Sequence, residues 1–67
     1  MEIFARRLKG LRKEKKLSQK KLGSLLCKTG TCIANWESGL HEPSLVDIIK
    51  LRYIFNVSVD YLIGLID

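Results

Sequence analysis

The sequence predicts an all-α fold of five short helices, and three observations point to it. Apolar residues recur three or four positions apart and nowhere alternate, which favours helices over strands. Ser or Thr stands where each helix after the first would begin, and these residue types are preferred N-caps. These four residues are Ser18, Thr29, Ser44 and Ser58. Because 67 residues provide only one small core, we expect residues 1–67 to form a single domain.

The N-terminal segment is expected to form a basic amphipathic helix over residues 2–16. Phe4, Leu8 and Leu11 lie on one face of it at helical spacing. The first 28 residues contain ten Lys or Arg against two Glu, whereas the remainder contains two basic residues against five acidic ones. Such a one-sided positive field raises the local concentration of polyanions. The charge pattern is compatible both with a phosphate-facing edge and with an ordinary solvated surface.

Two helices are expected in the C-terminal half. Ser44 caps a fourth helix, with Asp47 in the capping-box position. Because this helix is apolar almost all round, we expect it to be the central buried element. Ser58 caps a fifth helix that ends at Gly64, and Asn56 suits a left-handed turn between the two.

A helix-turn-helix is predicted in the middle of the chain. Two helices, at about 19–26 and 30–37, are joined by only three residues. So tight a connection sets the helices at a steep angle, and Gly23 is the small residue that such a crossing needs. The side chains expected to face inward are Leu22, Leu26, Ile33 and Trp36. Thr31 and Asn35 then form an uncharged, hydrogen-bonding outer face that suits the major groove of DNA.

Several motifs follow one another without a gap from about residue 4 to residue 65. They are Leu17-Ser18-Gln19, Leu22-Gly23, Ile33-Ala34-Asn35-Trp36-Glu37-Ser38-Gly39, Glu42-Pro43-Ser44 and Asn56-Val57-Ser58-Val59-Asp60-Tyr61-Leu62-Ile63-Gly64. Together they resemble the Cro/cI-type helix-turn-helix family, also called the XRE family. The resemblance implies a compact lambda-repressor-like domain that binds double-stranded DNA. It also implies a transcriptional regulator, a repressor that occupies a near-palindromic operator through the helix at 30–37.

The resemblance further implies roles for single residues. The positions that would contact DNA are Gln19, Lys28, Thr29, Gly30, Thr31, Asn35, Ser38 and His41. Gln19 takes a phosphate-contacting position, and Thr31 and Asn35 take base-reading ones. Considered alone, Gln19 is also compatible with a solvated first-turn residue and Thr31 with a neutral surface residue. Arg12 and Glu37 match a partly buried ion pair of similar proteins.

Two departures from the family pattern affect the expected recognition helix. Gly30 stands where many relatives carry a long polar side chain. Either the helix approaches the DNA more closely there, or base contacts move to Thr31 and Asn35. Lys28 replaces an apolar turn residue, so its ammonium group must extend into solvent or to a phosphate.

The two cysteines indicate neither a disulfide nor a metal centre. Cys27 stands where the family usually has a left-handed Gly, so a non-Gly residue there is strained by about 1 kcal/mol or the turn differs slightly. The side chain of Cys27 is expected to pack at the turn, and Cys32 is expected to be partly exposed. Together with His41 they would supply three ligands, whereas a structural zinc site needs four. The sequence contains no nucleophile–base arrangement and no phosphate loop. We therefore expect no metal, no cofactor, no small-molecule substrate and no enzymatic activity.

The ends of the chain bear on location and assembly. We expect a cytoplasmic protein, because no signal segment and no membrane-spanning stretch are present. Residues 53–66 carry more apolar side chains than one short helix can bury. This excess predicts a homodimer through the turn between the fourth and fifth helices and the C-terminal helix, unless the patch merely covers the first helix. An antitoxin that binds a toxin and represses its own operon is the alternative function, although few residues remain to bind such a partner.

Overall fold

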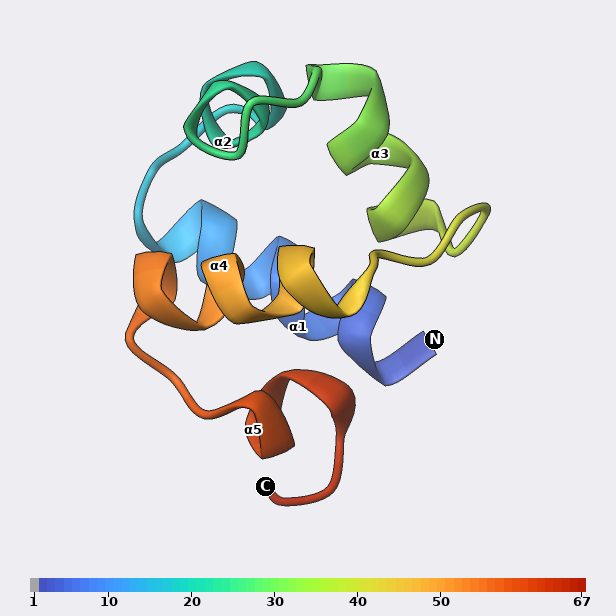
Figure 1. Cartoon of the computed structure of the whole chain (residues 1–67), viewed down its shortest axis with the longest axis vertical. Helices are drawn as coiled ribbons and strands as arrows, with labels where there is room; N and C mark the ends of the chain where they lie inside the picture. Colours follow the sequence, from blue (N-terminus) through green and yellow to red (C-terminus); the bar gives the residue numbers. More distant parts are fainter. Residues whose placement is uncertain (1) are drawn as a thin grey trace.

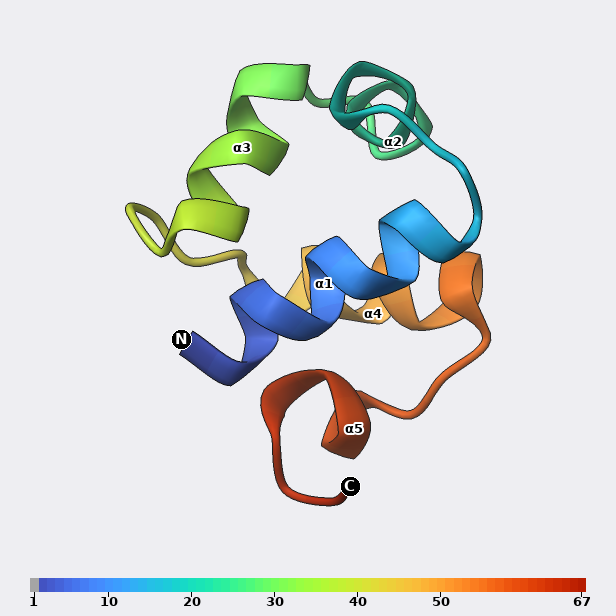
Figure 2. The same ribbon diagram turned by 180° about the vertical axis from the view of Figure 1, so that it is seen from behind.

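The structure, a computed structural model, describes residues 2–67, which form five α-helices and no strand (Figure 1). The helices are α1 (Glu2–Glu14), α2 (Gln19–Leu25), α3 (Gly30–Ser38), α4 (Leu45–Phe55) and α5 (Val59–Ile63). The predicted all-α fold is therefore confirmed. α1 and α4 cross at the centre, with α4 in front of α1 in Figure 1 and behind it in Figure 2. α2 and α3 lie at one end of the molecule and α5 lies at the other.

The four predicted N-cap residues cap α2, α3, α4 and α5. Each cap side chain accepts a hydrogen bond from the backbone N–H three residues further on. The backbone N–H of Ser44 also donates to Asp47 Oδ2 at 3.2 Å, which completes the predicted capping box. Left-handed residues stand where they were expected, at Gly39, Asn56 and Gly64.

α1 ends two residues earlier than predicted, because Lys16 adopts a left-handed conformation with φ of 56°. The backbone N–H of Leu17 donates to the carbonyl of Arg12 at 3.1 Å, and that of Lys16 donates to Lys13 at 2.9 Å. These two bonds form a Schellman motif, which satisfies carbonyls left free at the end of the helix. Because a lysine occupies the position usually held by Gly, no glycine in the sequence indicates this turn.

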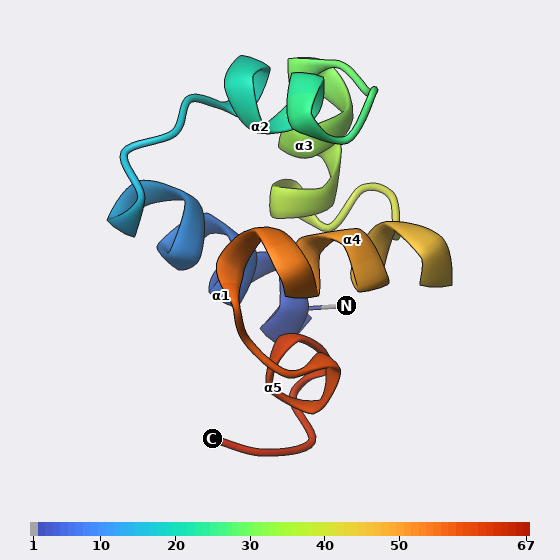
Figure 3. The ribbon, with the colours of Figure 1, turned by 60° about the vertical axis from the view of Figure 1, so that its left-hand side comes forward.

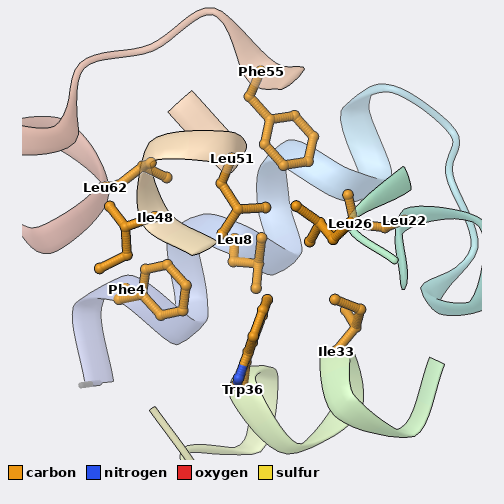
Figure 4. Packing of buried hydrophobic residues seen from close by; sticks show 10 residues of the cluster. All are labelled: Phe4, Leu8, Leu22, Leu26, Ile33, Trp36, Ile48, Leu51, Phe55 and Leu62. Carbon is orange, nitrogen blue, oxygen red and sulfur yellow. The ribbon is translucent and has the colours of Figure 1, made fainter. Parts of the chain in front are cut away.

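One apolar core lies between the five helices (Figure 4). Its buried members are Phe4, Leu8, Leu22, Leu26, Ile33, Trp36, Ile48, Leu51, Phe55 and Leu62. Leu22 of α2, Leu26 at the C-cap of α2, and Ile33 and Trp36 of α3 all point into it, as predicted. The helix-turn-helix is therefore fixed rigidly to the rest of the domain through its inner side.

α4 lies at the centre of the molecule, as predicted, but the expectation that it is buried all round is wrong. One face packs on the core, and the opposite face lies at the surface (Figure 3). The exposed apolar residues of α4, which we call the α4 outer face, are Leu45, Val46, Ile49 and Tyr53. No other helix among residues 2–67 covers them. The sequence thus identifies an apolar helix, but it does not show which face of that helix remains exposed to solvent.

The apolar excess predicted over residues 53–66 is largely absorbed by packing. Phe55 and Leu62 are buried, and only Tyr53, Leu65 and Ile66 remain exposed as large apolar side chains. Arg7 of α1 holds this end of the chain by donating hydrogen bonds to the carbonyls of Tyr61 and Ile66. Much of the predicted patch therefore covers α1, the alternative noted from sequence. No helix within residues 2–67 is long and apolar enough to cross a membrane.

Candidate nucleic-acid interface

The connection between α2 and α3 is held by backbone contacts that only a small residue permits. A Cβ atom on Gly23 would lie 2.6 Å from the carbonyl carbon and oxygen of Thr29. The backbone N–H of Lys28 donates to the carbonyl of Gly23 at 2.7 Å, which closes the end of α2. The predicted role of Gly23 at the helix crossing is therefore confirmed, and its neighbour across the crossing is the cap of α3.

Cys27 forms the left-handed step of this turn, with φ of 58°. The prediction that its side chain packs at the turn is wrong, because this conformation leaves the thiol exposed. Cys32 is partly exposed on α3, as expected, and both thiols are free. Within residues 2–67, no three potential metal-ligating side chains lie together.

The outer surface of α3 is uncharged. Thr31 is exposed and Asn35 is half-buried, whereas Ile33 and Trp36 face the core. The backbone N–H of His41 donates to the carbonyl of Asn35 at 3.2 Å, so the loop after α3 returns along the end of the helix. An α-helix with its side chains is about 10–12 Å across, so the major groove, about 12 Å wide, can admit α3.

Cations border α3 at both ends. Lys20 and Lys28 line an open hollow at its N-terminal end, together with Thr29, Gly30 and Thr31. Arg6 and Lys9 of α1 line a second hollow at its C-terminal end, beside Ser38 and Gly39, and the carboxylates of Glu2 and Glu37 line the same hollow. A short uncharged helix is thus placed between two pairs of positive side chains, which is the arrangement needed to contact base edges between phosphates.

Arg12 and Glu37 form the ion pair that the family resemblance implied. Arg12 Nε donates to Glu37 Oε2 at 2.6 Å, and an Nη2 hydrogen bond to Oε1 at 3.1 Å makes the contact bidentate. Only 11% of the Arg12 side chain and 4% of the Glu37 side chain are exposed. The hydrogen bonds that Arg12 donates to Glu37 raise the pKa of the Arg12 guanidinium above its ordinary value. Burial opposes this shift, and the negative charge of Glu37 adds to it.

Gln19 joins the same network. Its Nε2 donates to Glu37 Oε1 at 3.2 Å, so the first residue of α2 is linked to the end of α3. Arg12 Nη1 also donates to the carbonyl of Leu17 at 2.8 Å, just before α2. Sequence reasoning placed Gln19 at a phosphate without anticipating this contact, because residues 18 positions apart meet only through the tertiary fold.

The structure brings together some of the predicted DNA-contacting residues and separates others. Lys28, Thr29, Gly30 and Thr31 line a single hollow, whereas Asn35 lies one turn further along α3. Ser38 lies at the opposite end of α3, and His41 is exposed in the loop beyond it. The sequence prediction missed the cations Arg6, Lys9 and Lys20. The excess of basic residues in the N-terminal half indicated that such cations exist, but it did not show which of them lie beside α3.

The sequence matches known proteins along most of its length. A helix-turn-helix family model matches residues 8–62. The chain is 36% identical to YqaE of Bacillus subtilis (strain 168) over 61 residues, which are 91% of this chain and 53% of the relative. It is 31% identical to YobD of the same organism over 65 residues, 97% and 58% of the two chains. Both relatives carry the name uncharacterized HTH-type transcriptional regulator. The chain thus spans about half the length of these curated relatives.

Two solved structures resemble the domain closely. One is the P22 c2 repressor in complex with a synthetic operator, with a TM-score of 0.84, 27% identity and coverage of 92% of this chain and 94% of that one. The other is hydroxypropylphosphonic acid epoxidase from S. wedmorenis, with a TM-score of 0.82, 31% identity and coverage of 91% and 32%. The same shape therefore occurs in an operator complex and as about a third of an enzyme chain. The fold alone does not decide function, whereas the surface of α3 bears on it directly.

Proposed function

Because the chain belongs to the helix-turn-helix family of the XRE type, we propose that it is a transcriptional repressor that binds a specific sequence of double-stranded DNA. The observation that carries this proposal is the uncharged outer surface of α3 between two pairs of cations. The structural likeness to a repressor bound to its operator supports it. Relatives named as regulators favour this function over the antitoxin alternative and over an enzyme. The protein acts by occupying a promoter, without a cofactor.

In the proposed complex, α3 lies in the major groove and Thr31 and Asn35 contact base edges. The amide of Asn35 suits an adenine, to which it can both donate and accept a hydrogen bond. Gln19 contacts a phosphate from the start of α2. An amide nitrogen has two hydrogens, so Gln19 can donate one to Glu37 and the other to the phosphate. Lys20, Lys28, Ser38 and His41 complete the contacts with the DNA backbone.

Two substitutions separate base reading from phosphate binding. Asn35→Ala should lose about 1–3 kcal/mol on the preferred duplex and relax the preference at one position. Gln19→Ala should weaken binding to preferred and unrelated duplexes alike, because a phosphate carries no sequence information. Affinities are measured by fluorescence anisotropy at several salt concentrations. An unchanged affinity and motif for Asn35→Ala would refute the assignment.

A matched pair of lysine substitutions tests the position of the cations. Lys20→Ala should reduce the slope of log affinity against log salt by about 1, since it removes one phosphate contact. Lys50→Ala removes the same charge from the exposed side of α4 and should leave that slope nearly unchanged. Equal changes for the two variants would mean that general charge, rather than a docked α3, accounts for binding.

We further propose a homodimer on DNA, through the α4–α5 turn and α5. One recognition helix covers too few base pairs for useful specificity, and a two-fold dimer places two of them about 10 base pairs apart. Support comes from Tyr53 near the end of α4, which is 72% exposed, and from the exposed Leu65 and Ile66.

A charge placed in the proposed interface should break the dimer. Tyr53→Lys should convert a two-protomer complex on a duplex of about 20 base pairs into a weaker one-protomer complex. Val46→Lys, on the same helix but at its other end, is the control and should leave two protomers bound. Sedimentation of the labelled duplex gives the stoichiometry. A single wild-type protomer at saturation, with no symmetric motif, would disprove the dimer.

A further inference from the structure

The hollow at the N-terminal end of α3 has a composition that differs from the rest of the outer surface. It is an open depression of about 460 Å³, lined mostly by carbon atoms. Its lining residues are Lys20, Ser24, Lys28, Thr29, Gly30 and Thr31. At the edge of this depression, Gly30 lets α3 approach the first turn of α2 closely. A Cβ on Gly30 would lie 3.1 Å from the Cα and N atoms of Lys20.

Most hydroxyl groups in this hollow are already engaged. Thr29 Oγ1 accepts the backbone N–H of Cys32 at 3.1 Å, and Ser24 Oγ donates to the carbonyl of Lys21 at 2.8 Å. Because the hydroxyl of Thr29 caps α3, the methyl group of Thr29 remains available for apolar contacts. Lys20 and Lys28 carry their charges on flexible stems that can extend to the rim. The hollow thus combines a largely apolar floor with two cations.

We propose that this hollow receives the 5-methyl group of one thymine in each half-site, and that Gly30, Thr29 and Ser24 thereby determine sequence preference. The inference rests on the proposed binding of duplex DNA. In the major groove, the thymine methyl is the one apolar group that a base pair presents. Lys20 and Lys28 contact the phosphates on either side of that thymine. Gly30 therefore contributes part of the wall of an apolar reading site rather than a hydrogen-bond donor.

Replacing thymine by deoxyuridine removes only this methyl group, so it tests the proposal without altering the protein. Each thymine of the selected duplex is exchanged in turn, and the affinity of the wild-type chain is measured. One thymine in each half-site should show a loss of about fourfold, the value of burying one methyl-sized group. All other exchanges should change affinity by less than twofold. Replacing the phosphodiester linkage beside that thymine by an uncharged methylphosphonate tests the alternative occupant, a phosphate.

Two substitutions at one position connect the sensitive thymine to the hollow. Ser24→Leu fills the depression from α2, whereas Ser24→Ala loses the same hydroxyl but leaves the space open. Ser24→Leu should abolish the distinction between thymine and deoxyuridine, and Ser24→Ala should retain it. Melting curves check that both variants fold.

The outcomes separate this inference from the proposed function. A selected motif without any deoxyuridine-sensitive thymine would overturn the inference alone, as would equal sensitivity in the two Ser24 variants. Sensitivity to the methylphosphonate with none to deoxyuridine would assign the hollow to a phosphate and overturn the inference as well. Failure to select any motif would overturn the proposed function, and the inference with it.

Discussion

Removing the carboxylate of Glu37 perturbs the contact that joins α1, α2 and α3. Glu37→Ala deletes two hydrogen bonds from Arg12 and one from Gln19. The Arg12 guanidinium, only 11% exposed as a side chain, then keeps the carbonyl of Leu17 as its remaining partner among residues 2–67. A buried charge that loses its partner typically costs 3–5 kcal/mol. Because Leu17 still accepts a hydrogen bond from Arg12, we expect about 3 kcal/mol, toward the lower end of that range.

A loss of this size is easy to measure in so small a domain. About 3 kcal/mol corresponds to a fall in melting temperature of roughly 15 °C for a chain of this length. Glu14→Ala, which removes an exposed carboxylate at the end of α1, should change stability by less than about 0.5 kcal/mol. Thermal and urea denaturation followed by circular dichroism give both values. Equal shifts for the two variants would refute a buried ion pair and would place Arg12 toward solvent or DNA.

The raised pKa of Arg12 sets the pH dependence of this effect. A group whose pKa is raised by folding contributes stability that is fully present below its unfolded value and is lost as the pH rises through the folded value. For Arg12 that window lies at strongly alkaline pH, because the pKa of an arginine is high and folding raises it further. The difference in stability between the wild type and Glu37→Ala should therefore not diminish between pH 7 and pH 10. A clear decrease over that interval would contradict the contribution of a charged Arg12.

Three further substitutions test the turn and the thiols. Gly23→Ala should destabilise the fold by about 2 kcal/mol, because its Cβ would lie 2.6 Å from the backbone of Thr29. The control Gly10→Ala meets nothing within 4 Å and should be neutral or stabilising. Similar melting shifts for the two variants would argue against the close crossing. Cys27→Gly should raise stability by up to about 1 kcal/mol by relieving its left-handed conformation, and a fall would show that its thiol contributes to packing. A thiol reagent should modify the exposed Cys27 before Cys32, and the reverse order would contradict their exposures. Fresh protein should show no two-dalton loss by non-reducing mass spectrometry.

The helix starts could be predicted from sequence because they depend on local hydrogen bonds. Ser18 and Ser44 accept backbone N–H groups only three residues away, so adjacent residues suffice to identify them. Helix ends that use Gly39 or Gly64 were predictable for the same reason. The end of α1 was not, because Lys16 adopts a conformation that its side chain does not favour. Local backbone hydrogen bonds close that turn, but the residue type at its left-handed position does not identify it.

Features of the candidate interface that depend on distant residues were less accessible. The Arg12–Glu37 pair came from a family resemblance, whereas the contact of Gln19 with Glu37 required the relative placement of α2 and α3. The hollow beside Gly30 likewise depends on how closely α3 approaches Lys20. The apolar pattern of α4 indicated burial but not its outer face, since one run of apolar residues can serve a core and a surface at once.

Selection from a pool of random duplex DNA tests the central claim most directly, because it asks whether the outer surface of α3 distinguishes base sequences. The wild-type chain should enrich a near-palindromic motif whose half-sites are about 10 base pairs apart. The double variant Thr31→Ala/Asn35→Ala, which retains the fold and every cation, should bind the pool with similar salt dependence but enrich that motif poorly or not at all. Two results would contradict the account: a DNA pool that stays random after repeated rounds of selection by the wild-type chain, or enrichment of the same motif by the double variant.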